Sequence, residues 1–215
     1  MQQRTRIKIC GLTRPQDVDA AVDAGVDAIG LVFYRASPRY VNLEAAQRLV
    51  SRLPPFVTAV GLFVNAKDEG VDLVLREFPQ ILLQFHGDET ANECRRYARP
   101  YLRAVRMSAG VDLLDLSTHY YDAQALLLDA HVEAYGGSGK VFDWSLIPDH
   151  VPRPVVLSGG LYAGNVIDGI LQVRPTAVDV SSGVEVSKGI KDPLAMRQFC
   201  QAVREADRRL LDTES

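Results

Sequence analysis

The sequence predicts an α/β protein, a closed (β/α)8 barrel that forms a single domain over residues 1–215. Eight short apolar runs rich in β-branched residues recur along the chain, and segments with helical spacing separate most of them. Small, polar and reactive residues follow almost every run. A doubly wound open sheet is the alternative, but no Gly-x-Gly-x-x-Gly motif follows the first run.

The expected strands are read from near-continuous apolar runs, such as ALLLD and PVVLS, that are typical of strands covered on both faces. They lie at residues 6–10, 28–34, 58–64, 81–86, 101–107, 125–129, 154–158 and 177–181. Apolar residues at helical spacing predict helices at 17–24, 43–53, 89–98 and 193–209. The segment between the sixth and seventh strands is expected to be mostly loop.

Composition narrows the class of protein. Apolar residues make up 47% and charged residues 24%, which is ordinary for a globular chain, and a net charge of −3 does not favour nucleic-acid binding. Three cysteines without Cys-x-x-Cys spacing predict free thiols in a reducing, cytoplasmic compartment. Four scattered histidines predict no metal site, and we expect no cofactor, signal peptide or membrane span.

The loops after the seventh and eighth predicted strands predict a phosphate site. In such barrels these two loops often bind phosphate through backbone N–H groups. Here they read LSGGL, with Gly159 and Gly160, and DVSSGVE, with Ser182 and Gly183. A simple turn would explain one such loop, but two adjacent loops favour phosphate. The GGSGK run at 136–140 lacks the spacing of a P-loop, so it is a plain connection or a loop that closes over a ligand.

Two reactive residues close strands that lie on opposite sides of a barrel mouth. Cys10 ends the first strand and shares its face with Lys8, whose ammonium group would favour the thiolate. A buried structural cysteine is the alternative, and composition alone favours it. Asp129 closes a fully apolar strand, where it serves as a general acid or base or caps the next loop. Two such groups that face each other across a substrate suit a reaction in which one group donates a proton to the substrate and the other removes a proton from it.

Further strand-end residues are candidates for substrate contact. Arg39, after the second strand, either holds a carboxylate in a bidentate manner or is simply solvated. His86 shares a face with Gln84, so the two form a polar core pair or contact a ligand. Asp179 is expected to point into the mouth. Arg103 and Arg106 lie on opposite faces of the fifth strand, so at most one of them faces inward.

The ordered set of motifs resembles the phosphoribosylanthranilate isomerase family over most of the chain, from Lys8 to Asp192. The motifs are KICGLT, FYRASPRYV, VGLFVN, LQFHGDE, LLLDA, GGSGKVFDW, VLSGGL, VDVSSGVE and KGIKD.

The resemblance implies a cofactor-free enzyme of tryptophan biosynthesis that performs an Amadori rearrangement. Its substrate would be N-(5-phosphoribosyl)anthranilate and its product 1-(o-carboxyphenylamino)-1-deoxyribulose 5-phosphate. It further implies that Cys10 is the general base, Asp129 the general acid and Arg39 the carboxylate-binding residue. Phosphate would bind at Gly159, Gly160, Ser182 and Gly183. As partners we expect only a small phosphorylated molecule, with the chain a monomer or weak homodimer.

Three other functions compete with this one. One is a histidine-pathway sugar-phosphate isomerase, or a bifunctional enzyme that serves both pathways, which performs the same rearrangement. That family uses a pair of aspartates as acid and base, whereas this chain, by its resemblance, has Cys10 in the position of the base. A lyase or aldolase would use Lys8, the only lysine on a predicted strand, as a Schiff-base residue. A binding module that has lost its activity would keep the fold without the chemistry.

Overall fold

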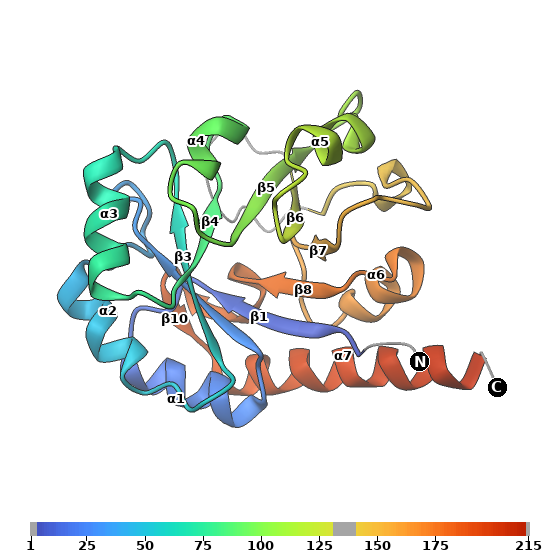
Figure 1. Ribbon diagram of the computed structural model, residues 1–215. Coiled ribbons are helices and arrows are strands. Elements are labelled where there is room, and N and C mark those ends of the chain that lie inside the picture. The colour runs from blue at the N-terminus through green and yellow to red at the C-terminus, as the bar shows by residue number, and fades with distance from the viewer. Residues whose placement is uncertain (1–3, 131–140, 214–215) are drawn as a thin grey trace.

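A closed parallel barrel of eight strands, β1 to β8 in chain order, forms the centre of the computed structural model, which describes residues 4–130 and 141–213 (Figure 1). The predicted barrel is therefore confirmed, and the open-sheet alternative is wrong. Most strands are one or two residues shorter than expected. The strands are β1 Arg6–Cys10, β2 Ala28–Val32, β3 Thr58–Phe63, β4 Leu82–Phe85, β5 Tyr101–Met107, β6 Ala125–Ala130, β7 Val155–Leu157 and β8 Ala177–Val180.

Helices on the outside of the barrel follow most strands, and the long α7 runs along one side of it (Figure 1). They are α1 Pro15–Ala24, α2 Leu43–Val50, α3 Asp68–Glu77, α4 Ala91–Arg95, α5 Leu113–His119, α6 Val166–Val173 and α7 Pro193–Thr213. Within the described part of the segment between β6 and β7, only the 3₁₀ helix η1, Trp144–Leu146, is regular, as expected. The GGSGK run at 136–140 lies outside the described residues.

Local signals explain where several helices begin and end. Pro15 occupies the first turn of α1, where its missing N–H costs no hydrogen bond, and Gly25 ends that helix with a φ of 82°. The Asn42 side chain caps α2 by accepting a hydrogen bond from the Ala45 N–H at 2.8 Å. Thr90 and Glu93 form a capping box, which makes α4 begin later than predicted.

The core has two parts, because successive strand side chains point to opposite sides of the barrel wall. The larger part lies between strands and helices and includes Ile7, Ile9 and Leu126. The smaller part fills the inside of the barrel and consists of Val60, Leu102, Ala104, Ala125, Leu127 and Val156. Cys10, Gln84, Asp129 and Asp179 have this inward parity and lie nearer the carboxyl ends of their strands.

A short hairpin that the sequence did not reveal follows β8. It consists of the 3₁₀ helix η2, Ser182–Val184, and the antiparallel strands β9, Glu185–Ser187, and β10, Ile190–Lys191. The Lys191 N–H donates to the Asp17 carboxylate at 3.1 Å, and the Thr13 hydroxyl donates to the Gly189 carbonyl at 2.5 Å. The hairpin therefore joins the loop after β8 to the loop after β1.

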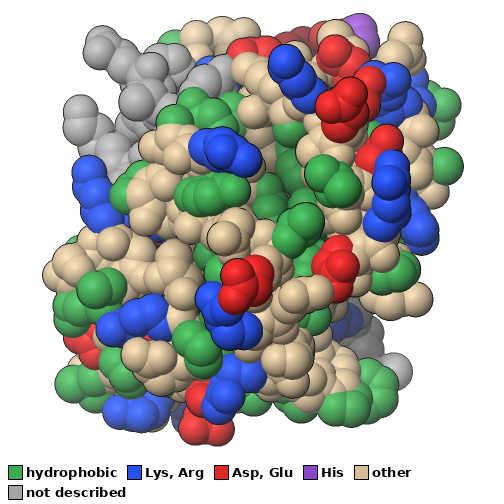
Figure 2. Space-filling model, turned by 90° about the vertical axis from the view of Figure 1, so that its left-hand side faces the viewer, with side chains coloured by type: hydrophobic (Ala, Val, Ile, Leu, Met, Phe, Trp, Pro, Cys, Tyr) green, Lys and Arg blue, Asp and Glu red, His purple; other side chains and the backbone are tan. Residues whose placement is uncertain are grey.

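No helix in residues 4–130 and 141–213 is both long enough and apolar enough to cross a membrane. On the face shown in Figure 2, basic side chains alternate with acidic ones around a hollow that contains hydrophobic side chains. This face therefore presents no extended basic surface to a nucleic acid.

Candidate active site

Cys10 lies among charged groups at the carboxyl end of β1. Directly below it, the Lys8 ammonium donates to Asp179 Oδ1 at 2.8 Å, and both side chains are buried. The Ser158 hydroxyl lies 3.5 Å from the other Asp179 oxygen. The Ser181 hydroxyl donates to the Cys10 carbonyl at 3.0 Å. Asp179 thus lies inside the barrel, as expected, but its carboxylate is paired with Lys8.

Room for the Cys10 thiol depends on a glycine. Gly30 is the register partner of Cys10 on β2, and a Cβ there would lie 2.5 Å from the Cys10 Sγ. A side chain at position 30 would therefore displace the thiol.

Lys8 acts on the Cys10 thiol in the expected direction, but other groups outweigh it. Burial raises the pKa of the Cys10 thiol, and the Asp179 carboxylate raises it further. The Lys8 and Lys191 ammonium groups lower this pKa, but by less than the other effects raise it. Lys8 therefore does not make the thiolate the favoured form in the unliganded chain, because desolvation of the thiolate outweighs the nearby charge.

Asp129 has a different set of partners, on the side of the barrel formed by β4 and β6. Its Oδ2 lies 3.0 Å from His86 Nε2, and its Oδ1 accepts from the Ala130 N–H at 2.9 Å. The other ring nitrogen of His86 lies 3.0 Å from Gln84 Nε2. The expected Gln84–His86 pair is therefore present, and it extends to Asp129.

Arg39 lies in the loop after β2, close to Cys10, with its side chain across Gly11. A Cβ at Gly11 would lie 2.4 Å from the Arg39 Cδ, and Gly11 has a φ of 78°. The guanidinium donates to Glu185 through Nε at 2.8 Å and Nη2 at 2.7 Å. Arg39 is only 6% exposed, so the alternative of a solvated arginine is wrong.

Glu185 and Lys191 are site residues that the sequence did not single out. The Lys191 ammonium donates to Glu185 Oε1 at 2.8 Å and to the Ser181 carbonyl at 3.0 Å. Burial raises the pKa of Glu185, but Arg39 and Lys191 lower it by more, so this carboxylate stays charged. Motif spacing gave no sign of this network because its two sides lie far apart in the chain.

The two glycine-rich loops touch each other at the same end of the barrel. Gly159 and Gly160 have φ values of 80° and 66°, which a side chain would strain. A Cβ at Gly183 would lie 1.9 Å from the Leu161 carbonyl oxygen, so the loop after β8 packs directly on the loop after β7. Ser182 precedes Gly183 in η2. A Cβ at Gly159 would also lie 2.9 Å from Asp129 Oδ1.

The two arginines of β5 differ in direction. Arg103 lies on the outer side, where it donates to Glu89 at 3.2 Å and to the Gly87 carbonyl at 3.0 Å. Arg106 has the inward parity of Leu102 and Ala104 and is half-exposed. Only Arg106 therefore belongs to the inner face.

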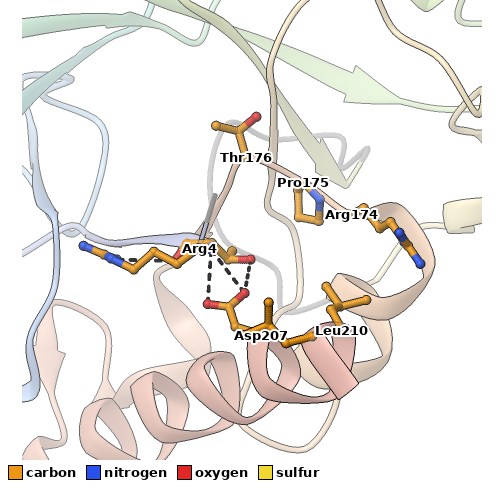
Figure 3. Close-up of a pocket in the computed structure, with 8 residues that line it drawn as sticks. Arg4, Arg174, Pro175, Thr176, Asp207 and Leu210 are labelled. Carbon is orange, nitrogen blue, oxygen red and sulfur yellow. Dashed lines mark hydrogen bonds between the residues drawn. The ribbon is translucent and has the colours of Figure 1, made fainter. Parts of the chain in front are cut away.

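A separate cavity of about 200 Å³ lies at the amino end of the barrel, between β1, β8 and α7 (Figure 3). There Asp207 of α7 accepts hydrogen bonds from the Thr5 N–H at 3.1 Å and the Thr5 hydroxyl at 2.7 Å. These bonds fasten α7 to the start of β1. They belong to the end of the barrel that serves stability.

Among the described residues, no three His, Cys, Asp or Glu side chains are placed to hold a metal ion. The chemistry that this arrangement allows is acid–base catalysis, since a thiol and a carboxyl group share one barrel mouth. An arginine and two glycine-rich loops surround them and are suited to bind anions.

Comparison with known proteins decides the family. The model of the N-(5'-phosphoribosyl)anthranilate isomerase family matches residues 7–202. This chain belongs to that family. The N-(5'-phosphoribosyl)anthranilate isomerase of Leptothrix cholodnii is 68% identical over 212 residues, which cover 99% of this chain and 96% of that one.

Solved phosphoribosylanthranilate isomerases have the same fold. The Thermotoga maritima structure is 42% identical and superposes with a TM-score of 0.85, covering 94% of this chain and 99% of that one. A complex with reduced 1-(o-carboxyphenylamino)-1-deoxyribulose 5-phosphate is 39% identical with a TM-score of 0.81 and the same coverage. The family resemblance, the barrel and the enzyme class, a phosphoribosylanthranilate isomerase of tryptophan biosynthesis, are thus confirmed.

Proposed function

We propose that this chain converts N-(5-phosphoribosyl)anthranilate to 1-(o-carboxyphenylamino)-1-deoxyribulose 5-phosphate, with Cys10 as general base and Asp129 as general acid. One observation carries the assignment. The two side chains have inward parity at the carboxyl ends of β1 and β6, strands that are not neighbours, so a substrate fits between them. A relative that binds the reduced product supports the substrate class.

The first step opens the ribose ring. Asp129 donates its proton to the ring oxygen as the bond between that oxygen and C1′ breaks, and the anthranilate nitrogen forms a double bond to C1′. In the second step the Cys10 thiolate removes the C2′ proton, and the electron pair of that C–H bond neutralises the iminium to give an enolamine. Tautomerisation of the enolamine yields the ketone. Each proton transfer is ordinary general acid–base catalysis.

Substrate anions would orient the reaction. The Nε and Nη2 edge of Arg39 is occupied by Glu185, which leaves the Nη1 and Nη2 end for the anthranilate carboxylate. We assign the phosphate to the contact between the loops at Gly159, Gly160, Ser182 and Gly183. His86, which bonds to Asp129, and Asp179, which is paired with Lys8, would then lie next to the ribose.

One competing function, a lyase or aldolase with a Schiff-base lysine, loses support from the geometry. A Schiff-base lysine needs a neutral amine, but Lys8 is held in an ion pair. Burial lowers the pKa of Lys8, while Asp179 and Cys10 raise it by more, so it lies above the usual lysine value. A histidine-pathway isomerase remains the rival substrate choice, and Cys10 in the base position favours the tryptophan-pathway substrate.

The deciding experiment measures turnover of freshly made phosphoribosylanthranilate by loss of anthranilate fluorescence. Cys10→Ser and Asp129→Asn should each lower kcat by about 100-fold or more. Ser117→Ala is the matched control, because Ser117 is a buried hydroxyl on α5 that donates to the Leu113 carbonyl of the same helix. A wild-type chain that binds a product analogue without turning substrate over would make it a binding module. Turnover of the histidine-pathway substrate alone would contradict the substrate assignment.

The remaining assignments from the sequence stay proposals. We propose one catalytic domain that acts in the cytoplasm, and the three cysteines, which are free thiols in the structure, support this compartment. We also propose a monomer or weak homodimer. A 37% identical relative is described as a monomeric form of a dimeric enzyme from Thermotoga maritima, so both states occur among similar chains.

A further inference from the structure

Gln84 is a fully buried amide at the edge of the apolar cluster inside the barrel. It pairs in register with Leu62 on β3 and Leu102 on β5, and no part of it is exposed. One end of the amide lies 3.0 Å from His86 Nδ1. The other end, Oε1, has no hydrogen-bond partner among the described residues. A buried amide with a single partner is unusual, so its bond to His86 calls for an explanation.

The direction of that bond follows from which end of the amide is unpaired. An under-satisfied carbonyl oxygen is tolerated in protein interiors more often than an orphaned N–H. The Gln84 amide therefore donates its N–H to His86 Nδ1. A neutral imidazole that accepts at Nδ1 carries its proton on Nε2, so His86 donates to Asp129 Oδ2.

We propose that Gln84 is a positioning residue that fixes the tautomer of His86 and thereby keeps the acidic proton of Asp129 on Oδ1. In the fixed tautomer, the His86 N–H donates to Oδ2, and the proton for the substrate is carried by Oδ1, the oxygen that faces away from His86. In the opposite tautomer, the bare Nε2 would accept a proton from Oδ2, and that proton would be held between His86 and Asp129. This role rests on the proposed function of Asp129 as general acid.

The position of Oδ1 supports this assignment. Oδ1 lies beside Gly159, in the loop that we assign to the substrate phosphate, whereas Oδ2 faces β4 and His86. The Ala130 N–H, which donates to Oδ1, leaves a second lone pair on that oxygen. Within the part of the chain that the structure describes, the Gln84 amide bonds to His86 alone, so Gln84 reaches this site through His86.

The test combines a spectroscopic readout with kinetics. In the ¹⁵N-labelled protein, His86→Gln identifies the signals of His86 among the four histidines. We expect the unliganded wild type to show a bare Nδ1 and a protonated Nε2. Gln84→Glu should place a proton on Nδ1, because a carboxylate only accepts. Gln84→Met, which offers no donor, should abolish the fixed tautomer.

The same variants should lower kcat by about 10- to 100-fold, the loss typical of residues that orient a functional group, with KM within about threefold. Leu102→Met is the matched control, since it changes the register neighbour of Gln84 without adding or removing a polar group. It should keep both the wild-type tautomer and the wild-type kcat.

A proton on Nδ1 in the wild type would overturn the proposal. Wild-type kcat in a Gln84→Met variant with an altered tautomer would overturn it equally. Failure of the proposed function is a separate result, since it would show as unchanged turnover in Asp129→Asn whatever the nitrogen signals of His86.

Discussion

The two sides of the barrel mouth hold their reactive groups by different means. The Cys10 side is built from buried full charges, with Lys8 paired to Asp179, and Glu185 shared by Arg39 and Lys191. The Asp129 side uses an imidazole, a side-chain amide and a backbone N–H. Buried charges therefore surround the thiol of Cys10, whereas uncharged hydrogen-bonding groups surround the carboxyl group of Asp129.

Lys8→Met should have the largest effect on stability of the substitutions on either side of the mouth. It leaves the Asp179 carboxylate buried without its ammonium partner, so the free energy of unfolding should fall by about 3–5 kcal/mol in urea titrations. Gln84→Met, on the other side of the mouth, removes no charge and should cost clearly less. Arg48→Met is the surface control, since Arg48 pairs with Glu44 in solvent, and its unfolding should hardly change. Equal losses in Lys8→Met and Arg48→Met would contradict this view of the charged side.

Glu185→Gln should have a smaller effect that is specific to substrate binding. It removes the charge that holds the Arg39 guanidinium in two hydrogen bonds, so we expect KM for phosphoribosylanthranilate to rise about tenfold. The value of kcat should stay within a few-fold, because neither proton-transfer group changes. Glu205→Gln, on the exposed part of α7, is the control. A loss confined to kcat would argue against a role through Arg39.

The smallest effect concerns the ionisation of Cys10. Because burial and Asp179 raise the pKa of the thiol, alkylation of Cys10 in the free enzyme should be slow at neutral pH and should accelerate in alkaline solution. Asp179→Asn removes a negative charge, so the acceleration should begin at a lower pH.

Peptide mapping after alkylation separates Cys10 from the other cysteines. Cys94 and Cys200 have no exposed surface, whereas Cys10 is 5% exposed, so both should react more slowly than Cys10. Cys10→Ser identifies the labelled peptide. A shift toward higher pH in Asp179→Asn would show that the sign of the Asp179 effect is wrong.

The sequence predicted the parts of this molecule that depend on local pattern. Strand periodicity located the barrel wall, the positions at strand ends singled out Cys10 and Asp129, and strand parity placed Asp179 on the inner side. The sequence could not predict that Arg39 contacts Glu185, because the two residues lie 146 positions apart. The hairpin that carries Glu185 also shows no alternation of apolar and polar residues. The direction of the pKa shift of Cys10 could not be predicted either, since it depends on how far the folded structure buries the thiol.

The place of the β9–β10 hairpin late in the chain affects when the site is completed during translation. Arg39 is synthesised early, but Glu185 and Lys191, which hold it, leave the ribosome near the end of translation. The last barrel strand, which pairs with the first, emerges just before them. A nascent chain released before residue 185 would have both Cys10 and Asp129 but would lack the carboxylate that holds Arg39. Under the role proposed for Arg39, substrate binding would therefore depend on synthesis of this hairpin.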